Sequence, residues 1–331
     1  MKAIVYEGFG SPDILRCQDI EKPTPGENEV LIKVYAASIN PLDWKVMKGG
    51  PLLVRILLGL GKPKIRRPGV DVAGEVEAIG RNLKQFKPGD EVFGTCVGAF
   101  AEYAISASAL GLKSVLVKKP ENVTFEQAAS APVAALTALQ GLRDKGRIQA
   151  GQNVLINGAA GGVGTFAVQI AKLFGAHVTG VCSTGNVNMV RSIGADQVID
   201  YTQDDFTQSG EHYDIILDCV GNRSLSACRR VLNSKGILVM VGAPDRATAI
   251  VARVIGALVW SCFGAKKMVF FIARVNQDDL TTLGEFMATG KMTPVIDRRY
   301  RLNEASEAFR YMEKKHARGK VVITRTSAVG D

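Results

Sequence analysis

The sequence NVLINGAAGGVG, residues 153–164, joins a short apolar run to a glycine-rich turn. In the following segment, residues 165–174, large apolar side chains are spaced among alanines as in a buried helix. A strand, a glycine turn and a helix in this order begin a dinucleotide-binding βαβ unit, because a pyrophosphate approaches only where side chains are absent. Ala159 stands at the first glycine position of the usual motif, with Gly161 and Gly164 at the second and third. The turn alone is therefore as compatible with a plain strand-to-helix connection as with a nucleotide site.

The length and composition indicate a globular protein of about two domains. The chain has 331 residues, of which 47% are hydrophobic and 22% charged. Its formal net charge is +9, carried by scattered lysines and arginines without a recognised nucleic-acid motif. We therefore expect a solvated basic surface and no specific nucleic-acid partner, and the mild positive field favours a phosphate-bearing cofactor.

The cysteines and the apolar segments bear on metal, redox and membrane roles. The six cysteines form no C-x-x-C pair, which argues against a structural zinc site and a secreted disulfide framework. The N-terminus lacks the long apolar core of a signal peptide, so we expect a cytoplasmic protein. Residues 51–60 and 249–264 are apolar but short for a membrane span, and each contains an arginine. They are expected in a buried helix or a loop at the mouth of the site, with peripheral membrane contact as the weaker alternative.

The pattern of predicted secondary structure changes near residue 120. Before it, short alternating segments punctuated by proline and glycine predict a small, irregular β-barrel. Thr124 and Gln127 then have the spacing of a capping box for a helix that begins near Phe125. From Asn153 onward, apolar strands alternate with helices, which predicts a parallel sheet with helices on both faces.

These segments together resemble the medium-chain dehydrogenase/reductase superfamily, in its zinc-free quinone oxidoreductase (zeta-crystallin-like) branch. The resemblance extends over nearly the whole chain and rests on motifs in a fixed order. They are residues 38–45 (SINPLDWK), 68–76 (PGVDVAGEV), 86–92 (FKPGDEV), 136–138 (LTA), 159–164, 194–196 (GAD), 218–221 (DCVG) and 319–322 (GKVV). The resemblance implies an α/β fold, in which a Rossmann doubly wound parallel-sheet domain (residues 121–275) is inserted in a GroES-like β-barrel domain. The barrel is then formed by residues 1–120 and 276–331, and relatives often form homodimers.

The resemblance also bears on the chemistry. Zinc alcohol dehydrogenases of the superfamily bind their catalytic metal through a cysteine and a Gly-His-Glu motif. The matching residues here are 40–43 (NPLD) and 69–71 (GVD), which contain neither cysteine nor histidine, and the four-cysteine zinc lobe is missing. Without a Lewis acid, an alkoxide formed from a saturated alcohol has no obvious stabilisation, whereas a quinone or an α,β-unsaturated carbonyl carries its own electron sink. We therefore expect zinc-independent hydride transfer to such an acceptor.

The cofactor preference is predicted from the segment that follows the turn. An NAD-type fold usually has an acidic residue about 20 residues after the glycines, bound to the ribose 2′-hydroxyl. The first acid after Gly164 is Asp196, which is too far along the chain, and residues 183–186 (STGN) are neutral. This favours NADPH, with NADH as the alternative. For Arg191, the sequence leaves open whether the side chain points toward the cofactor or lies on the surface. For Tyr201, it leaves open whether the ring lies near the 2′-phosphate or is a surface aromatic at the end of a strand.

The resemblance assigns the candidate site residues. It places Asn40, Asp43 and Lys45 in the active site, although the first two also suit a turn. The cofactor-binding candidates are Thr137, Ala160, Gly161, Gly162, Val163, Gly164, Ser183, Thr184, Tyr201, Val220, Gly242 and Lys320. Thr137 is otherwise a plain helix residue and Lys320 a surface lysine, and no residue is assigned to a metal. The proton donor stays open between Tyr103, Asp43 and solvent.

Two other functions remain open at this stage. One is a zinc-free NAD(P)-dependent alcohol dehydrogenase, which would oxidise simple alcohols. The other is a non-catalytic nucleotide-binding or RNA-binding crystallin-like protein, which the basic charge permits but the intact glycine turn does not favour.

Overall fold

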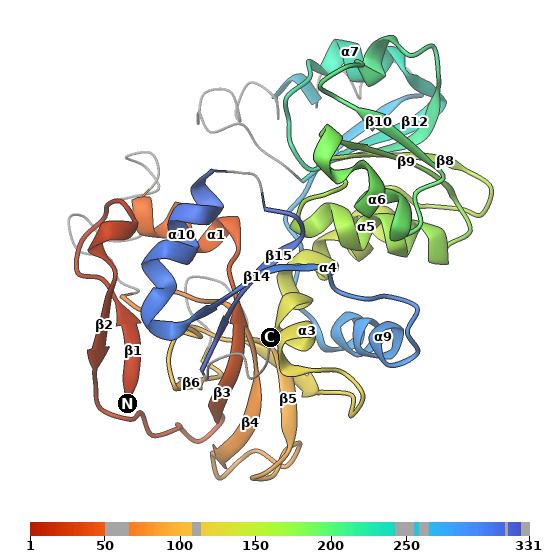
Figure 1. The fold of residues 1–331 in the computed structure, drawn as a ribbon. Helices are drawn as coiled ribbons and strands as arrows, with labels where there is room; N and C mark the ends of the chain where they lie inside the picture. Colours follow the sequence, from red (N-terminus) through yellow and green to blue (C-terminus); the bar gives the residue numbers. More distant parts are fainter. Residues whose placement is uncertain (50–65, 108–113, 242–254, 258–264, 315–316, 326–331) are drawn as a thin grey trace. The chain divides into compact units, whose positions relative to one another are not determined.

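The structure is a computed structural model, and it describes residues 1–49, 66–107, 114–241, 255–257, 265–314 and 317–325 (Figure 1). The chain divides into two compact units. The first unit contains residues 1–134 and 275–331, and the second contains residues 135–274.

The second unit is built on a six-stranded sheet in which all neighbouring strands are parallel. In spatial order its strands are β10 (Gln197–Asp200), β9 (His177–Cys182), β8 (Asn153–Asn157), β11 (Tyr213–Asp218), β12 (Leu232–Met240) and β13 (Lys267–Phe270). Numbered by their sequence, this is the order 3-2-1-4-5-6 of a Rossmann fold, with its switch point between β8 and β11. Ligands in such folds bind outside the carboxyl ends of the strands at that point, so these strand ends locate the candidate site.

The helices of the second unit are short and follow the strands. They are α5 (Gly162–Leu173), α6 (Val187–Ser192) and α7 (Leu225–Arg230), with η2 (Gly141–Lys145), η3 (Thr184–Asn186) and η4 (Phe206–Gln208) as single turns. In Figure 1, α5 and α6 lie on one side of the sheet and α7 on the other. Helix α5 buries Phe166, Val168 and Ile170 completely, as its spacing predicts, whereas Leu173 at its end is 37% exposed.

The first unit contains a seven-stranded, mostly antiparallel sheet. In spatial order its strands are β14 (Ile296–Arg301), β15 (Lys320–Thr324), β3 (Val30–Ser38), β4 (Asp71–Ile79), β5 (Glu91–Thr95) and β7 (Val115–Lys118), with β6 (Tyr103–Ile105) also paired to β3. A separate hairpin pairs β1 (Lys2–Val5) with β2 (Arg16–Asp19). The helices are α1 (Pro41–Lys48), α3 (Phe125–Ser130), α9 (Gln277–Ala288) and α10 (Ala305–Glu313), with η1 (Pro12–Ile14) and η5 (Leu302–Glu304). The predicted fold class is confirmed.

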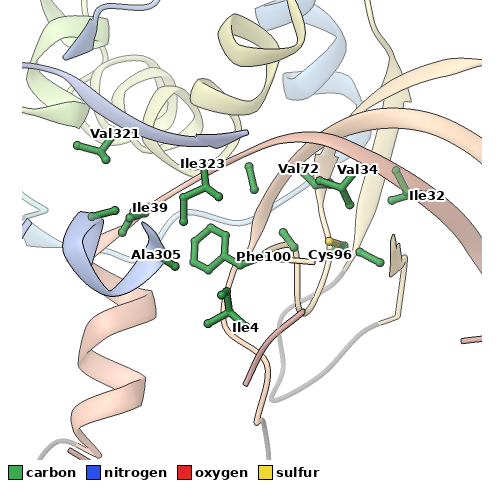
Figure 2. Close-up of a cluster of buried hydrophobic side chains, with 14 of the residues drawn as sticks. Ile4, Ile32, Val34, Ile39, Val72, Cys96, Phe100, Ala305, Val321 and Ile323 are labelled. Atoms are coloured by element: carbon green, nitrogen blue, oxygen red, sulfur yellow. The ribbon is translucent and has the colours of Figure 1, made fainter. Parts of the chain in front are cut away.

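The two ends of the chain share one hydrophobic core. Strand β15 pairs antiparallel with β3, so that Val322 lies opposite Ser38. Around this pairing, side chains from the first hundred residues pack against side chains from α10 and β15 (Figure 2). The rings of Phe100 and Phe309 meet edge to face, with 5.8 Å between their centroids. The N-terminal strands therefore cannot complete their core without the C-terminal segment.

The helix that follows residue 120 belongs by its contacts to the first unit. Thr124 caps α3 as its spacing predicts: its hydroxyl accepts a hydrogen bond from Gln127 N at 3.2 Å, and the Gln127 side chain accepts one from Thr124 N at 3.0 Å. Helix α3 packs on β3 and β4, and Phe125 stacks on Tyr35 with 4.6 Å between the ring centroids. The division therefore falls between residues 134 and 135, inside α4 (Pro132–Gln140), and not at the expected residue 121.

Candidate functional site

The glycine turn packs the start of α5 tightly against the end of β8. A Cβ atom added to Gly164 would lie 2.1 Å from the carbonyl oxygen of Gly158 and 2.7 Å from the Cα atom of Ala159. Gly158 itself has a φ of +88°, a conformation that favours glycine. Ala159 is fully buried, so its methyl group fills space inside the unit and leaves the outer surface of the turn open. This explains why alanine is tolerated at the first glycine position.

Gly161 has a different role from Gly164. A Cβ atom added to Gly161 would meet only the Gly158 carbonyl oxygen, at 3.4 Å, so the fold itself does not require a glycine there. Gly161 is the N-cap residue of α5 and has no side chain to occupy the first N–H groups, and the first turn contains no acidic residue. The positive end of the helix dipole is thus open to an anion. These residues, with the partly exposed Gly162 and Val163, fit the pyrophosphate of a dinucleotide.

The carboxyl end of β11 lies beside this turn and is held by Asp218. One oxygen of this buried carboxylate accepts hydrogen bonds from Asn157 Nδ2 at 2.8 Å, from Val220 N at 3.2 Å and from Gly221 N at 2.8 Å. The bonds fix Val220, a predicted cofactor-binding residue that is 43% exposed. The sequence-based assignment did not include Asn157 or Asp218. The signal was present, since each ends a strand next to the switch point.

Ser183 and Thr184 follow the carboxyl end of β9, as expected. The structure adds Asp200, which ends the neighbouring strand β10 and lies level with Cys182 in the parallel pairing. Thr184 Oγ1 donates a hydrogen bond to Asp200 Oδ2 at 2.6 Å. Asp200 was not among the sequence-based candidates, because an acid was expected only along the chain about 20 residues after the glycines. Strand pairing brings Asp200 to the segment that was expected to be free of negative charge.

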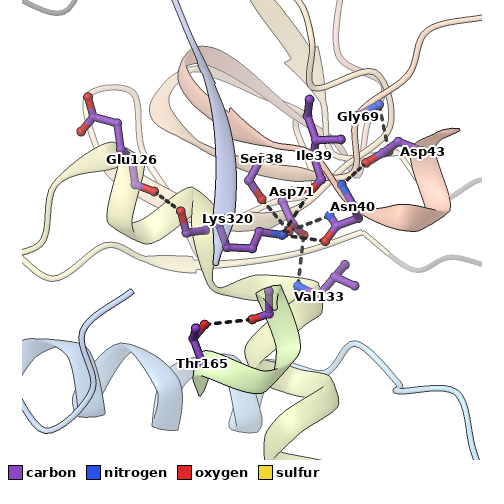
Figure 3. Close-up of polar contacts among 12 residues, drawn as sticks. Ser38, Ile39, Asn40, Asp43, Gly69, Asp71, Glu126, Val133, Thr165 and Lys320 are labelled. Carbon is purple, nitrogen blue, oxygen red and sulfur yellow. Dashed lines mark hydrogen bonds and ion pairs between the residues drawn. The ribbon is translucent and has the colours of Figure 1, made fainter. Parts of the chain in front are cut away.

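Three candidates of the first unit, Asn40, Asp43 and Lys320, form a buried polar cluster with Ser38 and Asp71, and each of the five is at most 5% exposed (Figure 3). The sequence-based assignment did not include Ser38 or Asp71. Asp71 Oδ2 accepts hydrogen bonds from Ser38 Oγ at 2.9 Å and from Asn40 Nδ2 at 2.8 Å. Lys320 Nζ donates to Asn40 Oδ1 at 2.7 Å and lies 3.5 Å from Asp71 Oδ2. The other oxygen of Asp71 accepts from the backbone N–H of Val133 at 3.1 Å.

Asp43 joins this cluster through the N-terminus of α1. One of its oxygens accepts a hydrogen bond from Asn40 N at 2.8 Å and the other accepts from Gly69 N at 3.2 Å. Burial, with a smaller contribution from the nearby Asp71 carboxylate, raises the pKa of Asp43 to about 7 against the opposing effects of the two N–H donors and Lys320. Burial likewise lowers the pKa of Lys320 from its usual value. Two carboxyl groups share one ammonium, so a proton on Asp43 would balance the charge of the cluster.

The remaining candidates are spread over both units. Lys45 is exposed on α1, with its ammonium 5.9 Å from the centre of the Trp44 ring, and does not enter the cluster. Thr137 lies partly exposed on α4 in the second unit. Tyr201 is 46% exposed after β10. Lys320, predicted to bind the cofactor, directs its ammonium into the buried polar cluster. Gly242 lies outside the described residues, as do residues 51–60 and much of 249–264.

Comparison with known proteins identifies the family. Two family models match: the alcohol dehydrogenase GroES-like domain at residues 26–120 and the zinc-binding dehydrogenase model at residues 193–323. The chain is 34% identical over 333 residues to the quinone-oxidoreductase QR1 of Triphysaria versicolor, with 98% of each chain covered. It belongs to the quinone oxidoreductase branch of the medium-chain dehydrogenase/reductase superfamily. The predicted family is confirmed.

The chain is also similar over nearly its whole length to other members of this family. The chain is 33% identical over 338 residues to the NADPH-dependent alkenal/one oxidoreductase of Arabidopsis thaliana, with 98% of this chain and 79% of the relative covered. The solved structure of the quinone oxidoreductase from Coxiella burnetii matches with a TM-score of 0.85 at 32% identity, covering 98% of this chain and 99% of that one.

The described residues contain neither a cluster of metal-ligating side chains nor a candidate membrane span. No group of three or more His, Cys, Asp and Glu side chains in these ranges is placed to hold a metal ion. In the same parts of the chain, no helix combines the length and apolar character that crossing a membrane requires.

The Asp71–Lys320 pair predicts a non-additive effect of mutation on stability. Lys320→Met leaves the Asp71 carboxylate buried without its cation, which should lower the free energy of unfolding by about 3–5 kcal/mol. The double variant Asp71→Asn/Lys320→Met should lose less than the sum of the single variants, because neither charge then remains buried alone. Urea unfolding followed by circular dichroism measures these differences. Lys45→Met, which removes an exposed lysine, is the control. An equal loss of unfolding free energy in that variant, or strictly additive losses in the double variant, would contradict the Asp71–Lys320 ion pair.

The raised pKa of Asp43 predicts a specific pH dependence. Between about pH 4 and pH 7 the folded state keeps a proton that the unfolded chain releases, because the unfolded pKa is about 3.9. This contribution to stability is complete below the unfolded pKa and is lost as the pH rises through the folded pKa. Relative to Asp43→Asn, the wild type should lose up to about 1.4 kcal/mol per pH unit over this range. Unfolding curves at four pH values test this, and a constant difference between the two proteins would refute it.

Proposed function

We propose that this chain is a zinc-independent, NADPH-dependent oxidoreductase that transfers a hydride to a quinone or to the activated C=C of an α,β-unsaturated carbonyl. The observation that carries the proposal is the open, acid-free N-terminus of α5 behind Gly161. It stands in a chain that is similar over nearly its whole length to quinone and alkenal/one oxidoreductases. The second of these relatives is described as NADPH-dependent, which supports NADPH as the cofactor of this chain, with NADH as an alternative.

The proposed roles of the residues follow from their positions in the two units. When bound, the nicotinamide cofactor supplies the hydride. The cofactor-side residues of the second unit are the glycine turn with Ala160 and Val163, the segment with Ser183 and Thr184, and the residues Thr137, Tyr201 and Val220. Their part is to hold the phosphates at a helix N-terminus and to fix the dinucleotide by backbone contacts. Gly242 and Lys320 complete the proposed set.

Asn40, Asp43 and Lys45 are the proposed acceptor-side residues, in two different roles. Asn40 and Asp43 fix the N-terminus of α1 through buried hydrogen bonds. Lys45 is exposed on the same helix, so its ammonium can donate a hydrogen bond to the oxygen of a small-molecule acceptor. A quinone or enone delocalises the incoming charge onto that oxygen, and one well-placed donor stabilises it in the transition state. Proton delivery stays open between Asp43, Tyr103 and solvent.

The donor set of the buried polar cluster supports zinc independence. It contains no thiol or imidazole, the groups that hold catalytic zinc most often. The Asp71 oxygens already accept four hydrogen bonds or ion-pair contacts, one of them from the ammonium of Lys320. A cation at this position is therefore supplied by the chain itself.

The assembly and location of the protein belong to the same proposal. We expect a homodimer in the cytoplasm with no specific nucleic-acid partner. Peripheral membrane contact through residues 51–60 is the weaker alternative, and that segment lies outside the described residues.

Gly161→Ala tests the proposed pyrophosphate site at the N-terminus of α5 separately from the fold. The methyl group meets only one atom of the protein, at 3.4 Å, so the midpoint of thermal unfolding should stay within about 2 °C of the wild type. The same methyl group obstructs a bound pyrophosphate, so the affinity for NADPH should fall about tenfold or more. The rates at which but-3-en-2-one and p-benzoquinone are reduced should fall with it. Calorimetry and the absorbance of NADPH measure the two effects.

Gly8→Ala serves as the control, because an added Cβ atom there meets nothing within 4 Å. Unchanged NADPH affinity in Gly161→Ala would contradict a pyrophosphate site at the N-terminus of α5. A wild-type protein that binds NADPH but reduces neither enone nor quinone would refute the proposed function.

A further inference from the structure

The end of β9 is where a Rossmann fold discriminates between phosphorylated and unphosphorylated adenosine ribose. An acid at the end of the second strand, or just after it, accepts a hydrogen bond from the 2′-hydroxyl. Here β9 is that second strand, and it ends at Cys182 with the neutral Ser183 and Thr184 next. The end of β9 therefore carries no negative charge of its own. Any negative charge near the adenosine ribose must come from a neighbouring element.

Strand β10 brings such a charge to this place. Asp200 is the last residue of β10 and lies opposite Cys182 in the parallel ladder. The backbone continues this pairing, since Tyr201 N donates to the carbonyl oxygen of Cys182 at 3.0 Å. The Asp200 side chain reaches Thr184 directly, with 2.6 Å between Thr184 Oγ1 and Asp200 Oδ2. The carboxylate is thus held against the segment that follows β9.

The contacts of Asp200 fix the carboxylate without neutralising it. Thr202 donates to Oδ1 from its N–H at 3.0 Å and from its hydroxyl at 2.8 Å, and Gln203 Nε2 donates to Oδ2 at 3.2 Å. Together with Thr184, all of these donors are uncharged. The hydrogen bond from Thr184 is the main cause that lowers the pKa of Asp200 from its usual value. Arg191 is exposed on α6 and contributes none of the four bonds.

The same contacts change what Thr184 can do. Its hydroxyl proton is directed at Asp200, so the hydroxyl offers an acceptor and not a donor to a ligand at this position. A 2′-phosphate needs donors or cations, whereas a 2′-hydroxyl needs an acceptor. The carboxylate and the oriented hydroxyl both suit the hydroxyl better than the phosphate.

We propose that Asp200 is a specificity-determining residue that repels a 2′-phosphate and accepts the 2′-hydroxyl of adenosine ribose, so that this chain uses NADH alongside NADPH. The inference rests on the proposed use of a nicotinamide cofactor and deepens it by naming the residue that sets its preference. It concerns one end of the cofactor only and is independent of the acceptor that is reduced.

The test measures binding of two cofactor fragments, 2′,5′-ADP and 5′-AMP, to the full chain by calorimetry. Asp200→Asn keeps the shape of the side chain and removes its charge. A unit charge about 5 Å from a phosphate in a mostly aqueous setting corresponds to about a tenfold effect on affinity. Asp200→Asn should therefore bind 2′,5′-ADP about tenfold more tightly than the wild type. Its affinity for 5′-AMP should fall about threefold, because the 2′-hydroxyl then loses a charged acceptor and keeps only a neutral one.

Asp204→Asn is the matched control, because it removes an exposed aspartate charge from the same loop. Unchanged binding of 2′,5′-ADP by Asp200→Asn, or an equal gain in Asp204→Asn, would overturn the proposal. If the wild-type protein binds neither fragment, both the role of Asp200 and the proposed use of a nicotinamide cofactor are refuted. If the expected gain is found but no quinone or enone is reduced, the role of Asp200 stands and the proposed reaction fails.

Discussion

A buried ion pair between Asp71 and Lys320 is the interaction on which the first unit depends. The two residues are 249 positions apart in the sequence, and both are at most 2% exposed. A buried carboxylate or ammonium left without a partner costs several kcal/mol, so neither charge is tolerated unless the C-terminal strand returns to the N-terminal sheet. The hydrophobic packing of Phe309 against Phe100 favours the same arrangement. The polar and apolar parts of the unit thus specify one topology.

The two candidate regions are built on opposite physical principles. In the first unit, polar side chains satisfy one another in a buried cluster, and the surplus carboxyl group, Asp43, has a pKa raised to about 7 by burial. In the second unit, the site depends on the absence of side chains, because Gly164 permits close packing and Gly161 leaves the helix N-terminus open. The first arrangement orders the start of α1. The second leaves a place for phosphates.

Much of this was predictable from local patterns in the sequence. The glycine turn, the alternation of strands and helices and the capping box at Thr124 each depend on residues close together in the chain, and the predicted fold class was confirmed. The family motifs extended the assignment to residues such as Asn40 and Val220, whose roles stay proposals.

What could not be predicted depends on partners that are distant in sequence. The sequence does not show that Lys320 directs its ammonium inward, because the acceptors, Asn40 and Asp71, come from the other end of the chain. Asp200 was passed over because its relation to Thr184 arises from the register of two parallel strands and not from spacing. Both are electrostatic relations set by tertiary structure.

The central claim is that this chain reduces a polarised acceptor with a hydride from a nicotinamide cofactor. The most direct measurement uses NADPH that carries deuterium at both C4 positions of the nicotinamide, with but-3-en-2-one as the acceptor and nuclear magnetic resonance of the product. We expect a saturated ketone that carries deuterium at the former β-carbon. Ketone without deuterium at that carbon, or no ketone from a protein that binds NADPH, would contradict it.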